Sequence, residues 1–190
     1  ESHTAYVNFF PRVPQLRRDF DAIDQRLSGA IPLYVVLSGN AAGAFARPDE
    51  LKAVDRLERA LDACGATSLW CLGDNFHDSE GAARLDPALA DRLERLSRQI
   101  ALHWITGNHD SALECGFGGQ VVEEADFRGL ALRHRAESCR SVPELSGHFH
   151  PRIRLRLRGR TVSRPCFVAC SDRLILPAFG ALTGGLDADN

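Results

Sequence analysis

The chain has 190 residues, a length that suits one domain with a single substantial core, so we expect residues 1–190 to form one domain. Hydrophobic residues make up 44% and charged residues 25%, which are ordinary values for a soluble globular protein. The net charge of −2 excludes a global attraction to nucleic acid or an anionic membrane, so any such binding needs a local patch. No apolar run approaches the roughly 20 residues that span a bilayer, and we expect no membrane association.

Two further features of the composition concern the setting of the chain. Six cysteines are scattered, several of them inside apolar runs, which favours reduced core thiols and a cytoplasmic location. The chain contains no methionine, so we expect Glu1 not to be the translational start. Residues 1–30 are a lead-in with no clear pattern.

The first half alternates strand and helix patterns. An apolar run at 33–37 predicts a strand that ends at Ser38-Gly39-Asn40. A helix is then predicted from Pro48 to a closing Gly65, with apolar residues at helical spacing. These are Leu51, Val54, Leu57 and Leu61. A second strand is predicted at 68–72.

A second helix is predicted to begin at Asp86-Pro87, with Asp86 as the N-cap and Pro87 in the first helical position. Its apolar stripe consists of Leu89, Leu93 and Leu96, and a third strand follows at 100–105. This β-α-β-α-β order predicts an α/β fold with a parallel sheet and helices on its faces.

The second half has a different texture, with short strand patterns separated by Gly, Pro and Ser. The predicted strands are 121–122, 130–132, 153–157, 166–168 and 174–176. Because no long helix pattern lies between them, we expect this half to be largely antiparallel.

Four polar stretches follow apolar or strand-like segments. They are Gly73–Asp78, Gly107–Asp110, Arg133–Arg135 and Gly147–Pro151. Alone, Asn108-His109-Asp110 fits a simple polar turn. Together the four stretches supply a carboxylate, an amide oxygen and three imidazoles, which Mn²⁺, Fe²⁺ or Zn²⁺ accept as ligands. The pattern therefore favours a metal site at the strand ends.

The motifs GD-x-x-H, GNHD and GHFH, in this order, resemble those of the calcineurin-like metallophosphoesterase superfamily. The C-terminal half carries further runs that resemble its bacterial branch of ligase-associated DNA-damage-response endonucleases or phosphoesterases. These runs are Gly147–Pro151, Arg158–Arg160, Pro165–Phe167 and Leu176–Gly185. The resemblance covers about residues 45 to 187 and implies a four-layer αββα sandwich.

The chemistry implied by this resemblance is hydrolysis of phosphate esters at a two-metal centre, with in-line attack of an activated water. Asp74 would bridge the two ions, and His150 would bind the first. Asn108, His134 and His148 would complete the second site. The ion would be Mn²⁺ first, with Fe²⁺, Zn²⁺ or Mg²⁺ as alternatives.

The resemblance also implies roles around the ions. His109 would act as the acid or charge-stabilising group, and Asp110 would orient it. His77 and Asp78 would orient the metal ligands.

One element of the superfamily pattern is missing. The superfamily opens with Asp-x-His, which binds the first metal, but no Asp-x-His occurs in this chain. Ser38 and Asn40 stand at the corresponding strand end and are weak ligands. We therefore expect one well-occupied metal site and one weak or empty site, with reduced activity.

An arginine ladder follows the last His motif. In the run 152–158, Arg152, Arg154 and Arg156 alternate with aliphatic residues, which predicts a strand with a basic face, and Gly159 then turns the chain. The face could be a solvated edge that discourages aggregation. Its place beside a predicted metal ligand favours contacts with phosphate or nucleic acid.

The leading hypothesis is a metal-dependent phosphoester hydrolase of the phosphodiesterase or nuclease type, with a nucleic acid as one candidate substrate. DNA repair, and a DNA-repair protein as partner, rest on the family resemblance alone. One alternative is a catalytically weakened relative that binds nucleic acid or a protein partner, which Ser38 and Asn40 favour. The other is a small-molecule phosphomonoesterase or pyrophosphatase.

Overall fold

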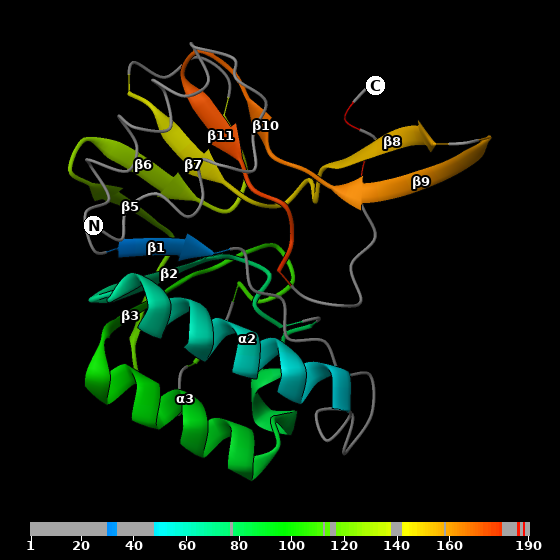
Figure 1. Ribbon diagram of the computed structural model, residues 1–190. Coiled ribbons are helices and arrows are strands. Elements are labelled where there is room, and N and C mark those ends of the chain that lie inside the picture. Colours follow the sequence, from blue (N-terminus) through cyan, green and yellow to red (C-terminus); the bar gives the residue numbers. More distant parts are fainter. Residues whose placement is uncertain are drawn as a thin grey trace.

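The computed structural model describes residues 30–33, 48–76, 78–111, 113–114, 117–137, 142–157, 159–179, 186 and 188. Two β-sheets face each other, and two helices cover the outer face of the first sheet (Figure 1). This is the predicted α/β sandwich. Among the described residues, no helix covers the outer face of the second sheet, so that layer of the αββα prediction lies outside them.

The first sheet contains strands β1 (Ala30–Leu33), β2 (Ser68–Leu72), β3 (Ala101–Ile105) and β4 (Gln120–Val122), all parallel and in that order. Helix α2 (Pro48–Cys64) connects β1 to β2. A short 3₁₀ helix, η3 (Ala82–Arg84), and α3 (Pro87–Gln99) connect β2 to β3. The parallel βαβαβ prediction is confirmed. Strand β1 begins three residues before the predicted strand, of which 34–37 lie outside the described residues.

The helix ends follow the local signals in the sequence. The backbone N–H groups of Gly65 and Ala66 donate to the carbonyls of Asp62 and Leu61, and Gly65 has a φ of +59°, which is the Schellman arrangement. At the start of α3, Asp86 Oδ1 accepts from the Ala88 N–H at 2.9 Å. Both helices are therefore placed by their caps as predicted.

The second sheet contains β5 (Glu124–Phe127), β6 (Leu130–Arg133), β7 (Glu144–Ser146), β10 (Val168–Ala169) and β11 (Arg173–Ile175). Its order is β10-β11-β7-β6-β5. The outer pairs are antiparallel, but β6, β7 and β11 pair in parallel. The strand predicted at 121–122, β4, instead pairs in parallel with β3 in the first sheet. The expectation of a largely antiparallel half is therefore wrong for β4 and for the centre of the second sheet. Every residue of β6 and β7 is buried, which is typical of central parallel strands. Separately, β8 (Arg152–Leu157) and β9 (Arg160–Pro165) form an antiparallel two-stranded ribbon.

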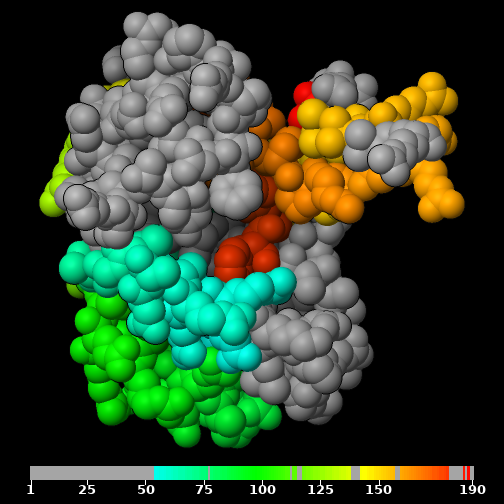
Figure 2. Space-filling view, viewed as in Figure 1, coloured from blue at the N-terminus to red at the C-terminus, as the bar shows by residue number. Residues whose placement is uncertain are grey.

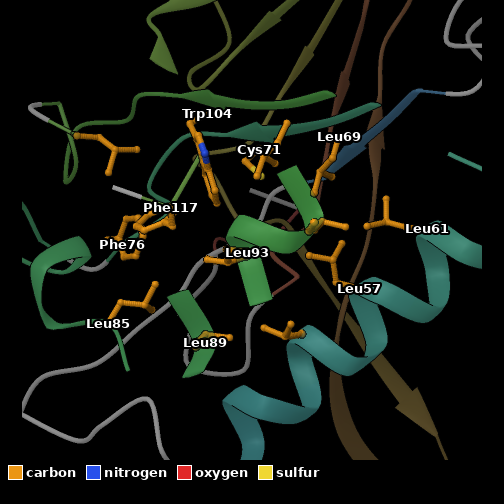
Figure 3. Close-up of a cluster of buried hydrophobic side chains, with 14 residues drawn as sticks. Leu57, Leu61, Leu69, Cys71, Phe76, Leu85, Leu89, Leu93, Trp104 and Phe117 are labelled. Atoms are coloured by element: carbon orange, nitrogen blue, oxygen red, sulfur yellow. The ribbon is translucent and has the colours of Figure 1, made fainter. Parts of the chain in front are cut away.

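Two hydrophobic cores lie on opposite faces of the first sheet, because successive side chains of a strand point to opposite faces. Leu69 and Cys71 of β2 face the helices and belong to the cluster in Figure 3, with Leu89 and Leu93 of α3. Trp70 and Leu72 of β2 face the second sheet. They pack against four leucines of that sheet: Leu130, Leu132, Leu145 and Leu174. The first sheet is thus covered on both faces.

Several smaller expectations have mixed outcomes. Cys71 is buried as expected, but Cys64 and Cys170 are exposed, so the prediction of core cysteines is wrong for these two. Leu57 and Leu61 of α2 are buried as predicted. None of the described helices has the length and apolar character that crossing a bilayer requires.

A core substitution tests the seating of α3 on the first sheet. Leu89 is 0% exposed, so Leu89→Ala removes buried apolar surface and leaves a cavity. We expect the free energy of unfolding to fall by about 3 kcal/mol in urea denaturation. The exposed Arg95→Ala on the same helix should change it by less than about 0.5 kcal/mol. Equal effects of the two substitutions would contradict this packing.

Candidate metal centre

The polar stretches of the sequence meet where strands of both sheets end. Asp74 follows β2, and Asn108 follows β3, in the first sheet. His134 follows β6, and His148 follows β7, in the second sheet. The parallel pairs β2–β3 and β6–β7 each present two carboxyl ends at one edge, which brings the four side chains together.

His134 lies at the centre of this group. Its Nε2 is 2.9 Å from Asn108 Oδ1, 2.9 Å from His148 Nδ1 and 3.2 Å from Asp74 Oδ2. Ligand atoms of Asp74, His134 and His148 all lie within 4.8 Å of one another, close enough to hold one metal ion. We call Asp74, Asn108, His134 and His148 the metal cluster.

The hydrogen bond on the other side of the His134 ring supports this interpretation. His134 Nδ1 lies 3.0 Å from the Leu72 carbonyl, which can only accept, so Nδ1 carries the proton. In the neutral ring Nε2 therefore presents a lone pair, and it faces the oxygens of Asn108 and Asp74. Lone pairs that converge in this way repel unless a proton on Nε2 or a metal ion lies among them, so the arrangement calls for a cation. Donation from the distal imidazole nitrogen to a carbonyl is also usual for metal-bound histidine, so these residues fit a divalent ion.

The protonation of the cluster also suits a cation. Burial raises the pKa of Asp74. Hydrogen bonds from His134 and from the His109 backbone, together with the positive charges of the His134 and His109 rings, outweigh burial. The pKa of Asp74 is therefore below its ordinary value. Burial and the neighbouring His134 lower the pKa of His148. The carboxylate is thus ionised and the His148 imidazole neutral, which are the forms that bind metal.

The backbone is strained at the same positions. Among the described residues, the non-glycine residues with positive φ are Asp74 (47°), His148 (61°), His150 (45°) and Arg128 (56°). The left-handed region is costly for residues with a Cβ, and such residues concentrate at functional sites. Three of the four are predicted metal ligands, a coincidence that no pattern in the sequence reveals.

Close packing around the centre depends on Gly107. A Cβ at Gly107 would clash with the carboxylate and the backbone nitrogen of Asp74. The absence of a side chain lets the loop after β3 approach the loop after β2. The glycine in the GNHD motif is therefore required by contact with the metal cluster.

His109 and Asp110 have different surroundings. The His109 side chain is 54% exposed, with Nε2 4.0 Å from Asp74 Oδ2, while its backbone N–H donates to Asp74 Oδ1 at 3.0 Å. Asp110 is 1% exposed and accepts from the Gly107 N–H at 2.7 Å and from the Asn75 backbone N–H at 2.7 Å. Through these bonds Asp110 joins the loop after β3 to the loop after β2.

Asn75 is the residue of this site that sequence reasoning missed. It is 0% exposed, and its Nδ2 donates both to Asp110 Oδ2 and to the Ile105 carbonyl at 3.0 Å. Asn75 thereby joins the loop after β2 to the end of β3. Its place next to Asp74 in the GD-x-x-H motif was the available signal.

The remaining predicted site residues are less central. Asp78 is bound by Arg84 at 2.6 Å and by the Glu80 N–H at 3.0 Å, contacts that shape the turn before η3. His150 lies near enough for its charge to lower the pKa of His148, but it is not part of the metal cluster. Predicted residues His77, Ser38 and Asn40 lie outside the described residues.

Arg133, the neighbour of His134, is buried in an ionic network. Its guanidinium lies 2.8 Å from a carboxylate oxygen of Glu137, 3.3 Å from one of Glu124 and 3.6 Å from one of Glu144. Glu144 on β7 is only 4% exposed. This network joins β5, β6 and β7 at the residue that precedes His134 of the metal cluster.

The fold and site together define an α/β sandwich with a candidate metal centre at its strand ends. No family model and no curated protein sequence matches the chain. Among solved structures, it is similar to the crystal structure of Pseudomonas putida nuclease MPE, with 30% sequence identity and a TM-score of 0.67. The match covers 84% of this chain and 77% of that chain. The chain belongs to the family of this nuclease.

Metal stoichiometry tests the composition of the centre. The metal cluster offers four ligand atoms for one ion, while the residues at the degenerate motif, Ser38 and Asn40, are weak ligands. We expect calorimetric titration with Mn²⁺ to show one tight equivalent. His134→Ala should weaken it at least tenfold, roughly the loss that follows even from removing an outer partner of a ligand. His103→Ala, outside the cluster, is the control, and two equally tight equivalents would contradict the prediction.

The contact at Gly107 gives a second test. Gly107→Ala should displace the Asp74 carboxylate and weaken Mn²⁺ binding at least tenfold, since a ligand moves. Gly129→Ala is the matched control, because a methyl group there meets nothing within 4 Å although its φ is +75°. Melting curves without metal show whether both variants fold. Binding by Gly107→Ala as tight as that of the unmodified protein would show that Asp74 is not a ligand.

Proposed function

We propose that this protein is a metal-dependent phosphoester hydrolase that cleaves phosphodiester bonds in nucleic acid. The convergence of Asp74, Asn108, His134 and His148 carries the proposal, because a carboxylate, an amide oxygen and two imidazoles at hydrogen-bonding distances suit a divalent ion. Membership in the family of a nuclease supports nucleic acid as the substrate class.

The metal cluster would hold the ion, with Mn²⁺ as the first candidate. A divalent ion there supplies positive charge that polarises the phosphoryl group and activates a water for in-line attack. The chain keeps the ligand atoms in place through the Leu72 carbonyl on one side of His134 and through the His109 N–H on Asp74. This bonding prepares the site before substrate arrives.

His109 is the candidate acid. Its imidazole is exposed at the edge of the metal cluster, unlike the buried ring of His134 and the half-buried ring of His148, so a substrate can reach it. A protonated Nε2 would donate its proton to the leaving oxygen as the phosphorus–oxygen bond breaks. Asp110 acts indirectly, by holding the loop that carries His109 against Asn75.

The finer assignments rest on the sequence motifs. The order of GD-x-x-H, GNHD and GHFH supports a place in the calcineurin-like superfamily, and the C-terminal motifs support a role in DNA repair. Ser38 and Asn40 favour a second candidate, a weakened relative that binds nucleic acid or a protein partner without efficient cleavage.

Hydrolysis of an aryl phosphodiester over a series of divalent ions tests the enzyme directly. We expect Mn²⁺-dependent release of the aryl alcohol, and a loss of roughly 10²- to 10⁴-fold in kcat for His109→Ala, because a general acid contributes about that factor. His103→Ala removes an imidazole that stacks on Trp70, away from the metal cluster, and should leave kcat unchanged.

The outcomes separate the alternatives. No hydrolysis with any ion, in protein that binds Mn²⁺, would overturn the enzymatic proposal in favour of the weakened relative. Faster hydrolysis of the aryl phosphomonoester than of the diester would instead support a small-molecule phosphomonoesterase.

A further inference from the structure

The β8–β9 ribbon stands apart from the sandwich. Its two strands pair with each other over residues 152–157 and 160–165, and among the described strands neither joins one of the two sheets. In Figures 1 and 2 the ribbon projects from the body of the molecule. A projecting ribbon buries little apolar surface, so packing alone does not account for its presence.

The ribbon is strongly basic on a protein that is not. Residues 151–170 contain six arginines and no acidic residue, whereas the whole chain has a net charge of −2. The positive charge is therefore concentrated on this projection. An anionic partner would be attracted to it and not to the rest of the surface.

The register divides the arginines between faces. Arg154 and Arg156 lie opposite Ser163 and Thr161, so one face carries exposed guanidinium groups beside hydroxyl groups. Arg152 begins this row but is half-buried, and its Nε donates to Ser163 Oγ at 3.0 Å. The basic row predicted from the sequence thus divides into a structural Arg152 and an exposed pair.

The other face of the ribbon mixes aliphatic and basic side chains. It carries Ile153 and Leu155 of β8, but β9 adds Arg164 opposite Ile153. Leu155 is 39% exposed. A protein partner bound through this apolar strip is therefore the competing use of the ribbon.

The root of the ribbon is attached to the metal centre. β8 begins two residues after His150 and four after His148. The Arg152 N–H donates to the Leu186 carbonyl at 2.9 Å, and the Cys166 N–H donates to the Pro151 carbonyl at 3.0 Å. The Leu186 N–H in turn donates to the Phe149 carbonyl at 3.2 Å, so the start of the ribbon is tied to the segment that carries His148.

We propose that Arg154 and Arg156 bind the phosphate backbone of a nucleic acid whose scissile phosphate lies at the metal cluster. The proposal rests on the proposed function for the location of that phosphate. The two arginines are about 6.8 Å apart along the strand. A stacked strand carries one phosphate per ~3.4 Å of its axis, and its winding backbone separates successive phosphates by more than this rise, so the two guanidinium groups can contact neighbouring phosphates. Contacts of this kind read no base, so binding would be independent of sequence.

The distance from the centre sets the length of nucleic acid that can use the ribbon. His148 and Arg154 are six residues apart, which an extended chain spans in at most about 21 Å. About six nucleotides of a stacked strand cover the same distance. An oligonucleotide of roughly 12 nucleotides, twice that span, is therefore a suitable probe.

The experiment measures binding of this labelled DNA oligonucleotide to the full chain by fluorescence anisotropy, with EDTA present to prevent cleavage. Arg154→Gln/Arg156→Gln should weaken binding by roughly tenfold to a hundredfold at about 50 mM salt. It should also lower the slope of log Kd against log salt by about 1.4, the value for two contacts with a single strand. Arg154→Lys/Arg156→Lys keeps the charge and should keep the slope.

Arg95→Gln/Arg98→Gln is the matched control, because it removes the same charge from exposed positions on α3. It should change the Kd less than twofold. An unchanged Kd and slope for the Arg154/Arg156 variant would overturn the proposal, as would an equal loss in the control, since net charge alone would then explain binding. Loss of binding in Leu155→Ser equal to that of the arginine variant would favour the apolar strip. Binding is read without catalysis, so failure of the aryl diester assay would leave this result interpretable.

Discussion

The hydrogen bond between His134 Nδ1 and the Leu72 carbonyl is the contact on which the candidate site depends. It joins the end of β6 in one sheet to the end of β2 in the other, and it sets the tautomer that turns Nε2 toward Asn108 and Asp74. If the sheets met at another offset, neither the ring orientation nor the group of ligand atoms would survive. The inter-sheet core around Leu72 and Leu132 is therefore part of the metal centre, although it contributes no ligand.

Elements with local signals could be predicted from the sequence. The spacing of Leu89, Leu93 and Leu96, the Asp86 cap and the closing Gly65 placed α2 and α3, because these interactions lie within one segment. Strand β7 was missed because only one of its three residues is apolar. Glu144 is buried there through its pairing with Arg133, which is distant in sequence. A polar residue in a central strand is understandable only when its partner is known.

The candidate metal centre likewise has features that could be predicted from the sequence and features that could not. Asp74, Asn108, His134 and His148 could be named as candidates because each lies in a polar stretch with ligand chemistry, and the family resemblance implied that they bind one ion. The structure brings all four together. The link through Asn75, the approach at Gly107 and the positive φ angles could not be predicted, since each depends on how one loop meets another. The ribbon shows a similar limit, because the role of Arg152 changes once Ser163 lies beside it.

The ligand atoms come in equal numbers from the two sheets, Asp74 and Asn108 from one and His134 and His148 from the other. An ion bound among them would act as a cross-link between the two layers of the sandwich. Sliding of one sheet over the other, which side-chain packing and the hydrogen bond between His134 and Leu72 otherwise resist, would then require breaking bonds to the ion. The same centre would thus join the two halves of the chain mechanically, and metal release would loosen the sandwich along the plane between its sheets.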